Sequence, residues 1–530
     1  MSLLSQWRLL VASVVISLAG SFHVGYQASI SNSASTAMQT FIANTTGATG
    51  GTLTFLWSAY SSSLLLSGAV SVLLAPPVAD RFGRRVALFG IVALMLLALV
   101  VGLLAVYVES IYALFAMRLG VGAASAAGMA VQATLVSESA PSSRRGAMNT
   151  LQVASLQFGF VVGLVVASAD ALGSLALWQY LFCIEIVVAV VHLLCVALFI
   201  HESPEYLLLN GRTEAAAAAI RFYHGRKANV DQLIALMQHT PAASQHQQPN
   251  DKNDTETVVV RTEGVRPEET AVSRDEPASK SDSMSFLEIA RHPVIRRALA
   301  LCVAISLSAA FSGIFAMNLY CVQLLSATGF TDSQAANLTV IVGVVGLMSM
   351  LLASYVVERL GLQRLNVEHT GLQIAFININ NENLRARSCA ACAFANLLML
   401  ALNELYRALG DAYFGYLFLA AEMLFFVVYL MGVGAIWVFI VSECVPQSAR
   451  AKCQSLTVSA FYFGSFLAPL LFMPLNDAVD AYSFLLFAVP MLASTVVYWF
   501  LMPETKGKSV DDVMREIGAK KQRAPEGAPL

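Results

Sequence analysis

Long apolar stretches dominate the sequence, and short polar segments separate them. A helix needs about 20 mostly apolar residues to cross the hydrocarbon core of a bilayer, and twelve stretches reach that length. They cover residues 7–28, 53–77, 86–107, 111–137, 148–170, 177–199, 298–324, 334–357, 388–408, 413–441, 453–475 and 480–502. The pattern therefore predicts an all-α membrane protein with twelve transmembrane helices. Because the first stretch lacks a cleavage site of small residues, we interpret it as a retained span.

The distribution of lysine and arginine between the loops predicts the orientation. With twelve spans both chain ends lie on one side, and the loops of that side hold nearly all the basic residues. Basic loops stay on the cytoplasmic face, so we expect both termini in the cytoplasm and a multi-pass protein of the plasma membrane. The long first outer loop, 30–52, has no charge and contains the sequon Asn44-Thr45-Thr46. Asn44 is thus the predicted glycosylation site.

Composition narrows the class of protein further. Hydrophobic residues make up 57% of the 530 residues and charged residues only 12%, about half the charged fraction of a soluble protein. This excludes a disordered, collagenous or nucleic-acid-binding chain. The eight cysteines lie mostly in apolar stretches, where we expect buried thiols and neither a disulfide framework nor a metal site. Without a phosphate-binding loop or a nucleophile constellation, we expect no enzyme and no cofactor.

The spans divide six and six around a polar segment. Residues 1–200 form the predicted N-terminal six-helix bundle and 298–505 the C-terminal one. Between them, 201–297 is a predicted cytoplasmic loop with short helices and a segment, 240–283, too polar to bury a core and so disordered. The C-terminal half also contains a polar insert near 366–387, and residues 506–530 are a cytoplasmic tail.

Charged motifs recur in the two halves in the same order. Asp80-Arg81-Phe82-Gly83-Arg84-Arg85 follows the second span, and Glu358-Arg359 follows the eighth. Glu138 and Arg145 at the end of span four correspond to Glu443 and Arg450 at the end of span ten, with the same spacing in both halves. Glu202 closes span six, and Glu504 closes span twelve. Three motifs in register indicate two homologous bundles.

These motifs predict a set of salt bridges at the cytoplasmic surface. A carboxylate at one helix end can bind an arginine at the next, since guanidinium groups bind carboxylates in bidentate fashion. Such pairs would hold the bundles together in one state and separate in the other, as alternating access requires. The predicted gate residues are Asp80, Arg81, Arg84, Arg85, Glu138, Arg145, Glu202, Glu358, Arg359, Glu443, Arg450 and Glu504. The alternative is that the arginines only fix the topology.

Several motifs resemble the sugar porter family of the major facilitator superfamily, specifically the facilitative glucose and fructose transporters of animals. The resemblance covers nearly the whole chain outside 240–283 and 366–387. It rests on Thr52-Leu53-Thr54-Phe55-Leu56-Trp57-Ser58, Arg118-Leu119-Gly120-Val121-Gly122, Glu138-Ser139-Ala140-Pro141, Glu202-Ser203-Pro204-Glu205-Tyr206-Leu207-Leu208 and Pro503-Glu504-Thr505-Lys506-Gly507. It implies the major facilitator fold and transport of a small solute bound between the bundles.

The resemblance also implies a substrate site that is less polar than in hexose carriers. The family's fifth-span glutamine position holds Val153, its two seventh-span glutamines are Ala309 and Ala310, and its span-eleven asparagine is Phe461. Because one lost hydrogen-bonding partner costs about 1–3 kcal/mol, we expect weak affinity for ordinary hexoses. The candidate substrate residues are Gln152, Gln157, Ser308, Ser312, Phe315, Asn318, Tyr320 and Trp437.

Proton coupling is a separate question. Proton-coupled members of the family have an aspartate after Gly-Tyr in span one, where this chain has Gln27. Glutamine does not titrate, so facilitated diffusion of a sugar, polyol or other small organic solute is the expected function. Ionisable residues within spans are nevertheless functional candidates, which makes Glu185 and Glu422 possible coupling residues. The resemblance implies that Arg118 is paired within the N-terminal bundle.

Two other functions stay open. One is a proton-coupled organic solute carrier that uses Glu185 or Glu422, and the other is a transport-inactive, sensor-like relative. The expected partners are the solute and the lipid bilayer, with no nucleic acid and no requirement for an oligomer.

Overall fold

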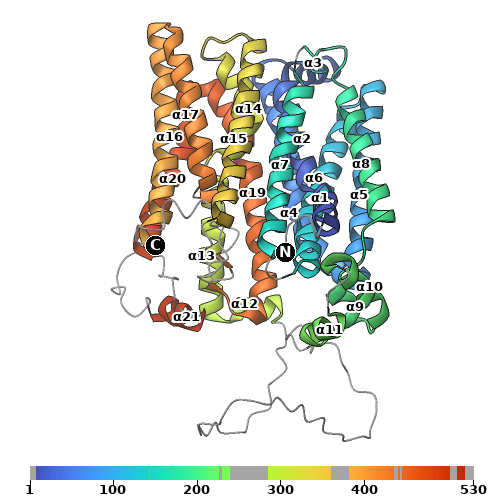
Figure 1. Cartoon of the computed structure of the whole chain (residues 1–530). Helices are drawn as coiled ribbons and strands as arrows, with labels where there is room; N and C mark the ends of the chain where they lie inside the picture. The colour runs from blue at the N-terminus through green and yellow to red at the C-terminus, as the bar shows by residue number, and fades with distance from the viewer. Residues whose placement is uncertain are drawn as a thin grey trace, which may run out of the picture.

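The architecture comes from a computed structural model of the chain. It describes residues 7–141, 144–168, 170–225, 229–238, 284–359, 381–431, 433–434, 440–441, 444–501 and 510–519. The helices of residues 7–198 and those of residues 293–501 form two groups that stand side by side (Figure 1). We call them the N-half and the C-half.

Long helices make up the N-half. They are α1 (Trp7–Ser17), α2 (Ser21–Ser33), α3 (Ser35–Thr46), α4 (Gly50–Phe82), α5 (Arg84–Tyr107), α6 (Ile111–Ser139), α7 (Arg145–Val166) and α8 (Tyr180–Leu198). Gly83 separates α4 from α5 with a φ of 98°, a backbone conformation that glycine adopts without strain. Ser110 begins α6 by accepting a hydrogen bond from the N–H of Ala113, the usual role of a helix-capping serine.

Short helices follow between the two halves. They are α9 (Pro204–Leu209), α10 (Thr213–His224), α11 (Val230–Gln238) and α12 (Phe286–Arg291). Ser203 caps α9, and Pro204 occupies its first turn, where a missing N–H costs nothing. Ser285 and Glu288 form a reciprocal capping box at α12. These helices lie at the end of the molecule opposite α3 (Figure 1), so we call the two ends the α3 end and the α9 end.

The C-half repeats the arrangement of long helices. It contains α13 (Pro293–Ala310), α14 (Ile314–Ser326), α15 (Asp332–Arg359), α16 (Asn381–Leu409), α17 (Ala412–Met431), α19 (Gln447–Val479), the 3₁₀ turn η5 (Asp480–Phe484) and α20 (Leu485–Leu501). The amphipathic α21 (Val510–Ala519) follows near the α9 end (Figure 1).

The helices account for the predicted crossings. Among the described residues, eight segments are long and apolar enough to span a membrane, or nine if the bent pair α1–α2 counts as one span. One of them, Ser448–Trp499, contains both α19 and α20. The apolar part of α7 (Leu151–Val166) is shorter, and α15 has 28 residues. With these helices included, the arrangement is consistent with the predicted twelve-helix fold in two bundles.

The structure adds detail to the sequence-based element boundaries at several places. The first outer loop, expected over 30–52, is largely helical, because α2 continues to Ser33 and α3 follows almost directly. The first span is bent by 43° between α1 and α2. The seventh span, expected to run through 298–324, is broken between α13 and α14 at Gly313, whose φ is 100°. The predicted polar insert near 366–387 lies mostly outside the described residues, and its last part, from Asn381, belongs to α16.

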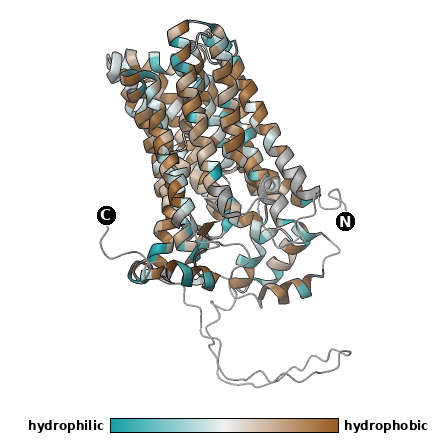
Figure 2. Ribbon diagram, turned by 90° about the vertical axis from the view of Figure 1, so that its left-hand side faces the viewer, coloured by the Kyte–Doolittle hydropathy of each residue, from teal (hydrophilic) through white to brown (hydrophobic). Residues whose placement is uncertain are grey.

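The outer surface of the long helices is apolar. Many large hydrophobic side chains are more than half exposed there, for example Leu97, Val187, Phe394 and Trp499. Figure 2 shows that hydrophobic residues predominate along these helices. A water-soluble protein seldom exposes so much contiguous apolar surface, so this surface fits the hydrocarbon of a bilayer.

Glycine allows α2 and α7 to pack with their backbones close together. Gly25 on α2 lies so near to α7 that a Cβ atom there would be 2.0 Å from the carbonyl oxygen of Leu156. On α7, Gly159 meets the backbone of Phe22 in the same way. Small residues at such positions let membrane helices pack backbone to backbone. The side chains of α2 are therefore held in a fixed position relative to the rest of the N-half.

Candidate functional site

Among the described residues, three helix pairs make the main contacts between the two halves. These are α4 with α19, α7 with α15, and α2 with α14. Each pair joins one N-half helix to one C-half helix. A carrier that alternates between two states must break and remake such contacts, so the boundary between the halves is the candidate site.

At the α3 end, Asn32 of α2 holds α14 through main-chain atoms. Its Nδ2 donates to the carbonyl oxygen of Asn318 at 3.0 Å, and its Oδ1 accepts from the N–H of Val322 at 3.0 Å. These two peptide groups are one helical turn apart. Asn32 is fully buried, and a buried amide that uses both its donor and its acceptor fixes orientation as well as distance. A second link at this end is the hydrogen bond from Thr54 Oγ1 to Asp477 Oδ2 at 2.5 Å.

Further along the boundary, other polar contacts join the halves. Ser459 Oγ on α19 donates to the carbonyl oxygen of Ala69 on α4 at 2.7 Å. The hydroxyl of Tyr462 lies 3.3 Å from the sulfur of Met129 on α6. The boundary is therefore linked by several single hydrogen bonds, each of modest strength.

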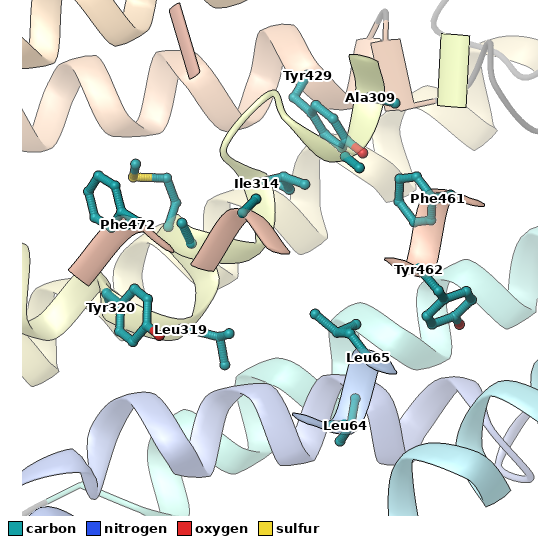
Figure 3. Close-up of a cluster of buried hydrophobic side chains, with 14 of the residues drawn as sticks. Leu64, Leu65, Ala309, Ile314, Leu319, Tyr320, Tyr429, Phe461, Tyr462 and Phe472 are labelled. Carbon is teal, nitrogen blue, oxygen red and sulfur yellow. The ribbon is translucent and has the colours of Figure 1, made fainter. Parts of the chain in front are cut away.

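A cluster of buried apolar side chains lies at the boundary. Figure 3 shows Leu64 and Leu65 of α4 near Leu319 of α14, with Phe461 and Tyr462 of α19 close by. All five are at most 6% exposed. The ring of Phe461 also packs edge-on against Phe315, with 5.9 Å between the ring centroids. Dispersion and solvent exclusion therefore hold the centre of the boundary.

The two candidate glutamines of α7 differ in their contacts. Gln157 donates from Nε2 to the carbonyl oxygen of Gly343 on α15, at 3.1 Å. It therefore lies at the boundary and joins the two halves. Gln152 is 8% exposed and stands five residues nearer to the α9 end of the same helix.

The candidates near the break between α13 and α14 are mostly engaged with their own half. Ser312 Oγ donates to the carbonyl oxygen of Ala309 at 2.8 Å, and Ser308 Oγ lies 3.9 Å from the sulfur of Met491. Tyr320 is buried and donates to the carbonyl oxygen of Pro469 at 3.2 Å. Asn318 offers Asn32 only its main-chain oxygen. Trp437 lies outside the described residues.

The charged motifs of the N-half form one cluster at the α9 end, the Arg84 cluster. Arg84 NH2 lies 2.9 Å from Glu138 Oε1 and 3.0 Å from Asp80 Oδ1. Its guanidinium also stacks over the ring of Tyr206, 5.2 Å from the centroid. Glu202 accepts hydrogen bonds from the N–H groups of Arg84 and Arg85 at the start of α5, where a carboxylate complements the helix dipole.

The remaining gate residues of the N-half are placed around this cluster. Arg85 donates to the carbonyl oxygens of Val196 and Ala197 at the end of α8. The carbonyl oxygen of Arg81 accepts a hydrogen bond from the hydroxyl of Tyr206. These contacts join helices of the N-half to one another. In this structure Asp80, Arg84, Arg85, Glu138 and Glu202 are therefore engaged within the N-half. That they also link the two halves in another state stays a prediction.

The corresponding residues of the C-half are only partly described. Arg450 lies half-buried in the first turn of α19. The backbones of Glu358 and Arg359 belong to the end of α15, and that of Arg145 begins α7, but their side chains are outside the description. Glu443 and Glu504 fall outside the described residues. For these positions the clamp between the halves stays a prediction.

A second charged cluster, the Glu185 cluster, lies inside the N-half. His23 Nδ1 on α2 lies 2.8 Å from Glu185 Oε1 on α8, and both side chains have no exposed surface. Gln27 Nε2 donates to the other carboxylate oxygen, Glu185 Oε2. Arg118 NH1 on α6 donates to Gln27 Oε1 and, at 3.2 Å, to the Gln27 carbonyl oxygen. Glutamine thus stands between a buried cation and a buried anion.

The sequence analysis names Glu185 as a possible coupling residue, Arg118 as a paired residue of the N-terminal bundle and Gln27 as the replacement of an aspartate. It does not show that they contact one another or that His23 joins them. The contact from His23 to Glu185 joins residues 162 positions apart. Glu185 and Arg118 each stand alone among apolar residues in their own helices. Because a buried charge needs a partner, this isolation was the signal in the sequence that could have paired them.

Glu422 has a different environment in the C-half. It is fully buried on α17 and lies beside the thiol of Cys321 on α14. Both its carboxyl oxygens are buried without a hydrogen bond that meets normal geometry.

We predict that Asn32→Ala loosens the α3 end. The substitution removes both hydrogen bonds to α14. A loss of about 1.4 kcal/mol of stabilisation would raise the population of molecules whose halves are separated at this end roughly tenfold. Spin labels at Thr46 of α3 and Tyr482 of η5, both exposed, report the distance between the halves by double electron–electron resonance. We expect a second, longer distance in the variant.

The matched control is Asn210→Ala. Asn210 is exposed, and its amide bonds only to Tyr206 within α9, so the distance distribution should equal that of the unsubstituted protein. An unchanged distribution in Asn32→Ala would contradict the role of Asn32 in joining the halves.

The fold and the boundary together define a class of protein. Two groups of long apolar helices that meet along α2–α14, α4–α19 and α7–α15 make a two-bundle membrane carrier of the major facilitator type. The model of one family, described as "Sugar (and other) transporter", matches residues 12–516. The chain belongs to this family and is a multi-pass membrane transporter.

Individual relatives agree with this assignment. The chain is 25% identical to the facilitated glucose transporter member 3 of Mus musculus over 536 residues, which cover 98% of this chain and 96% of that protein. It is also 25% identical to the facilitated glucose transporter member 5 of Homo sapiens, over 98% of this chain and 94% of that protein.

Solved structures agree on the fold. An inward open conformation of the xylose transporter XylE from E. coli matches with a TM-score of 0.69 and 16% identity, over 96% of this chain and 99% of the other. A partially occluded inward open conformation of the same transporter matches with a TM-score of 0.68 and 17% identity, over 94% of this chain and 99% of the other.

Proposed function

We propose that this chain carries a small sugar-like or polyol solute across the membrane as a uniporter. Residues 1–200 and 298–505 would act as the two bundles that rock against each other. The observation that carries the proposal is the boundary itself, where separate hydrogen bonds such as Asn32 to α14 and Ser459 to Ala69 join the halves. Contacts of this strength can be exchanged between two states at low cost.

The solute would be less polar than a hexose. Ala309 and Ala310 are fully buried beside the break in the seventh span, and Phe461 packs against Phe315. Polar groups remain in Gln157, which joins the halves, and in Gln152. A ligand with several hydroxyl groups would lose hydrogen bonds against such a lining, whereas a smaller or partly deoxygenated solute would lose fewer.

The proposal includes the orientation and the partners. Both termini, residues 201–297 and the tail 506–530 would face the cytoplasm of a cell with this chain in its plasma membrane. Asn44, exposed near the end of α3, would then face outward and accept a glycan. The relatives are named as transporters, and carriage of a solute requires no catalysis, nucleic acid or oligomer.

A solute panel tests the proposal. The purified chain in proteoliposomes is offered radiolabelled D-glucose, D-fructose, D-xylose and 2-deoxy-D-glucose. We expect saturable uptake of at least one solute that stops at equal concentrations on both sides and persists after a protonophore collapses the proton gradient. D-Glucose should be taken up at least about tenfold more slowly than the preferred solute. This factor corresponds to a loss of about 1.4 kcal/mol of hydrogen bonding between D-glucose and the site.

Other results would favour the alternatives. Accumulation that the protonophore abolishes would indicate a proton-coupled carrier. Absence of uptake for the whole panel, by a protein that remains monodisperse on size exclusion, would favour a sensor-like relative and count against the proposal.

A further inference from the structure

Two buried serine hydroxyls of α4 lack the bond that serines inside helices usually make. A helical serine commonly donates to the carbonyl oxygen three or four residues earlier. Ser62 Oγ bonds in this way to the Ser58 carbonyl oxygen at 2.7 Å, and Ser63 Oγ bonds to that of Tyr60 at 2.8 Å. Within the part of the chain that the structure describes, Ser58 Oγ and Ser61 Oγ make no hydrogen bond of normal geometry. A buried hydroxyl in this condition gains stabilisation from a group that can bond to it.

Both hydroxyls lie next to the C-half. Ser58 and Ser61 are three residues apart and so share one side of α4. The hydroxyl of Tyr320 on α14 lies beside both of them. It donates its own proton to the carbonyl oxygen of Pro469 at 3.2 Å, which leaves its oxygen able to accept. The three side chains are at most 1% exposed. We call Ser58, Ser61 and Tyr320 the hydroxyl cluster.

The hydroxyl cluster lies between the α3 end and the apolar part of the boundary. Thr54, one helical turn before Ser58, bonds to Asp477 at the α3 end. Leu65, one turn after Ser61, belongs to the buried apolar cluster (Figure 3). A solute that enters from the α3 end, when the halves are apart there, would therefore meet these hydroxyls before it meets the apolar side chains.

The serines are fixed to the N-half, whereas the tyrosine belongs to the C-half. Arg118 of α6 donates from NH2 to the carbonyl oxygen of Ser61 at 3.2 Å, and its guanidinium lies over the ring of Tyr60 at 5.2 Å from the centroid. Phe115 of α6 packs edge-on against the same ring. This stretch of α4 should thus remain with α6 when the halves separate. Ser58 and Ser61 would then lose Tyr320 as a neighbour.

We propose that Ser58 and Ser61 bind hydroxyl groups of the solute, in the place that Tyr320 occupies here, when the halves are apart at the α3 end. The ligand is a pair of neighbouring hydroxyl groups of a sugar or polyol, because hydroxyls both donate and accept. At this spacing the two Cβ atoms are about 5–6 Å apart, so one solute molecule can contact both. The inference rests on the proposed transport function and adds polar contacts that Phe315 and Phe461 cannot supply.

A comparison of protein and solute hydroxyls tests the site. The purified full chain and the double variant Ser58→Ala with Ser61→Ala are titrated in detergent with D-glucose and with its 2-deoxy, 3-deoxy and 6-deoxy analogues. Thermal stabilisation reports the apparent Kd and requires no transport. We expect the double variant to bind D-glucose at least about tenfold more weakly. At least one deoxy analogue should bind equally to both proteins, because it lacks the matching hydroxyl.

Ser63→Ala is the matched control. Ser63 is buried on the same helix, but its hydroxyl bonds to its own helix, so this variant should bind every sugar as the unsubstituted chain does. Alanine favours a helix more than serine, so all three alanine substitutions should leave the protein folded. In proteoliposomes the KM of the transported solute should rise in the double variant while the maximal rate changes by less than about twofold.

The outcomes separate this site from the proposed function. Equal weakening for D-glucose and all its deoxy analogues would show that the serines act through packing, and it would overturn the site. Unchanged affinities and an unchanged KM in the double variant would overturn the site and keep the function. Hydroxyl-dependent binding without uptake of any solute would keep the site and overturn the function. A chain that no sugar stabilises and that takes up no solute would overturn both.

Discussion

Gly25→Ala should prevent the N-half from assembling. The new methyl group would stand 2.0 Å from the carbonyl oxygen of Leu156 and 2.8 Å from the N of Phe160, and backbone atoms cannot rotate away as a side chain can. Overpacking costs about 1–3 kcal/mol and occasionally more, and contact with rigid backbone places this site at the upper end. We expect the variant to lose most of the monodisperse peak in fluorescence-detected size exclusion and to melt at a lower temperature.

Gly90→Ala is the matched control for this prediction. Gly90 is also inside a long helix, α5, but nothing lies within 4 Å of the position of its Cβ. Alanine favours helix over glycine by about 1 kcal/mol, so Gly90→Ala should be as stable as the unsubstituted chain or slightly more stable. Equal behaviour of the two variants would contradict the close approach of α2 and α7.

Arg84→Ala should destabilise the α9 end of the N-half strongly. The side chain of Glu138 is only 14% exposed, and Arg84 is its ion-pair partner at 2.9 Å. Removing one member of a buried pair leaves an uncompensated charge and costs about 3–5 kcal/mol. We expect a large fall in the apparent melting temperature, measured by intrinsic fluorescence in detergent.

Two further variants sharpen the result. Glu138→Gln combined with Arg84→Ala removes the unpaired charge and should recover much of the lost stability. Arg407→Ala breaks an exposed pair with Asp480, whose atoms are 2.7 Å apart, and should have no measurable effect because water screens it. If Arg84→Ala were as mild as Arg407→Ala, the Arg84 cluster would have no structural role.

Hydropathy predicted most helices well because membrane spans need length and apolar content above all. The expected span 86–107 is α5 (Arg84–Tyr107), and 111–137 is α6 (Ile111–Ser139). The same criterion missed α3, whose sequence is rich in serine, threonine and alanine. Hydropathy also predicted one uninterrupted helix across Gly313. Apolar residues continue on both sides of this glycine, and only its backbone angle marks the end of one helix and the start of the next.

The charged residues show a similar limit at the candidate site. Repetition of motifs identified Arg84, Glu138 and Glu202 as a set, because short spacing along the chain and position at helix ends are visible in the sequence. It could not show that these residues pair within one half. The sequence also could not predict the contact between His23 and Glu185. A single sequence does not show which faces of two distant helices pack against each other.

The contact of Asn32 with α14 uses only the peptide groups at Asn318 and Val322. The identity of the side chains at these two positions is therefore immaterial to the bond, and only proline at 322, which lacks an N–H, would abolish it directly. In a saturation mutagenesis screen, intolerance at Asn32 would reflect this contact, whereas effects at Asn318 and at the buried Val322 would reflect only the packing of their own side chains. A survey of substitution tolerance would thus detect one side of this contact and overlook the other.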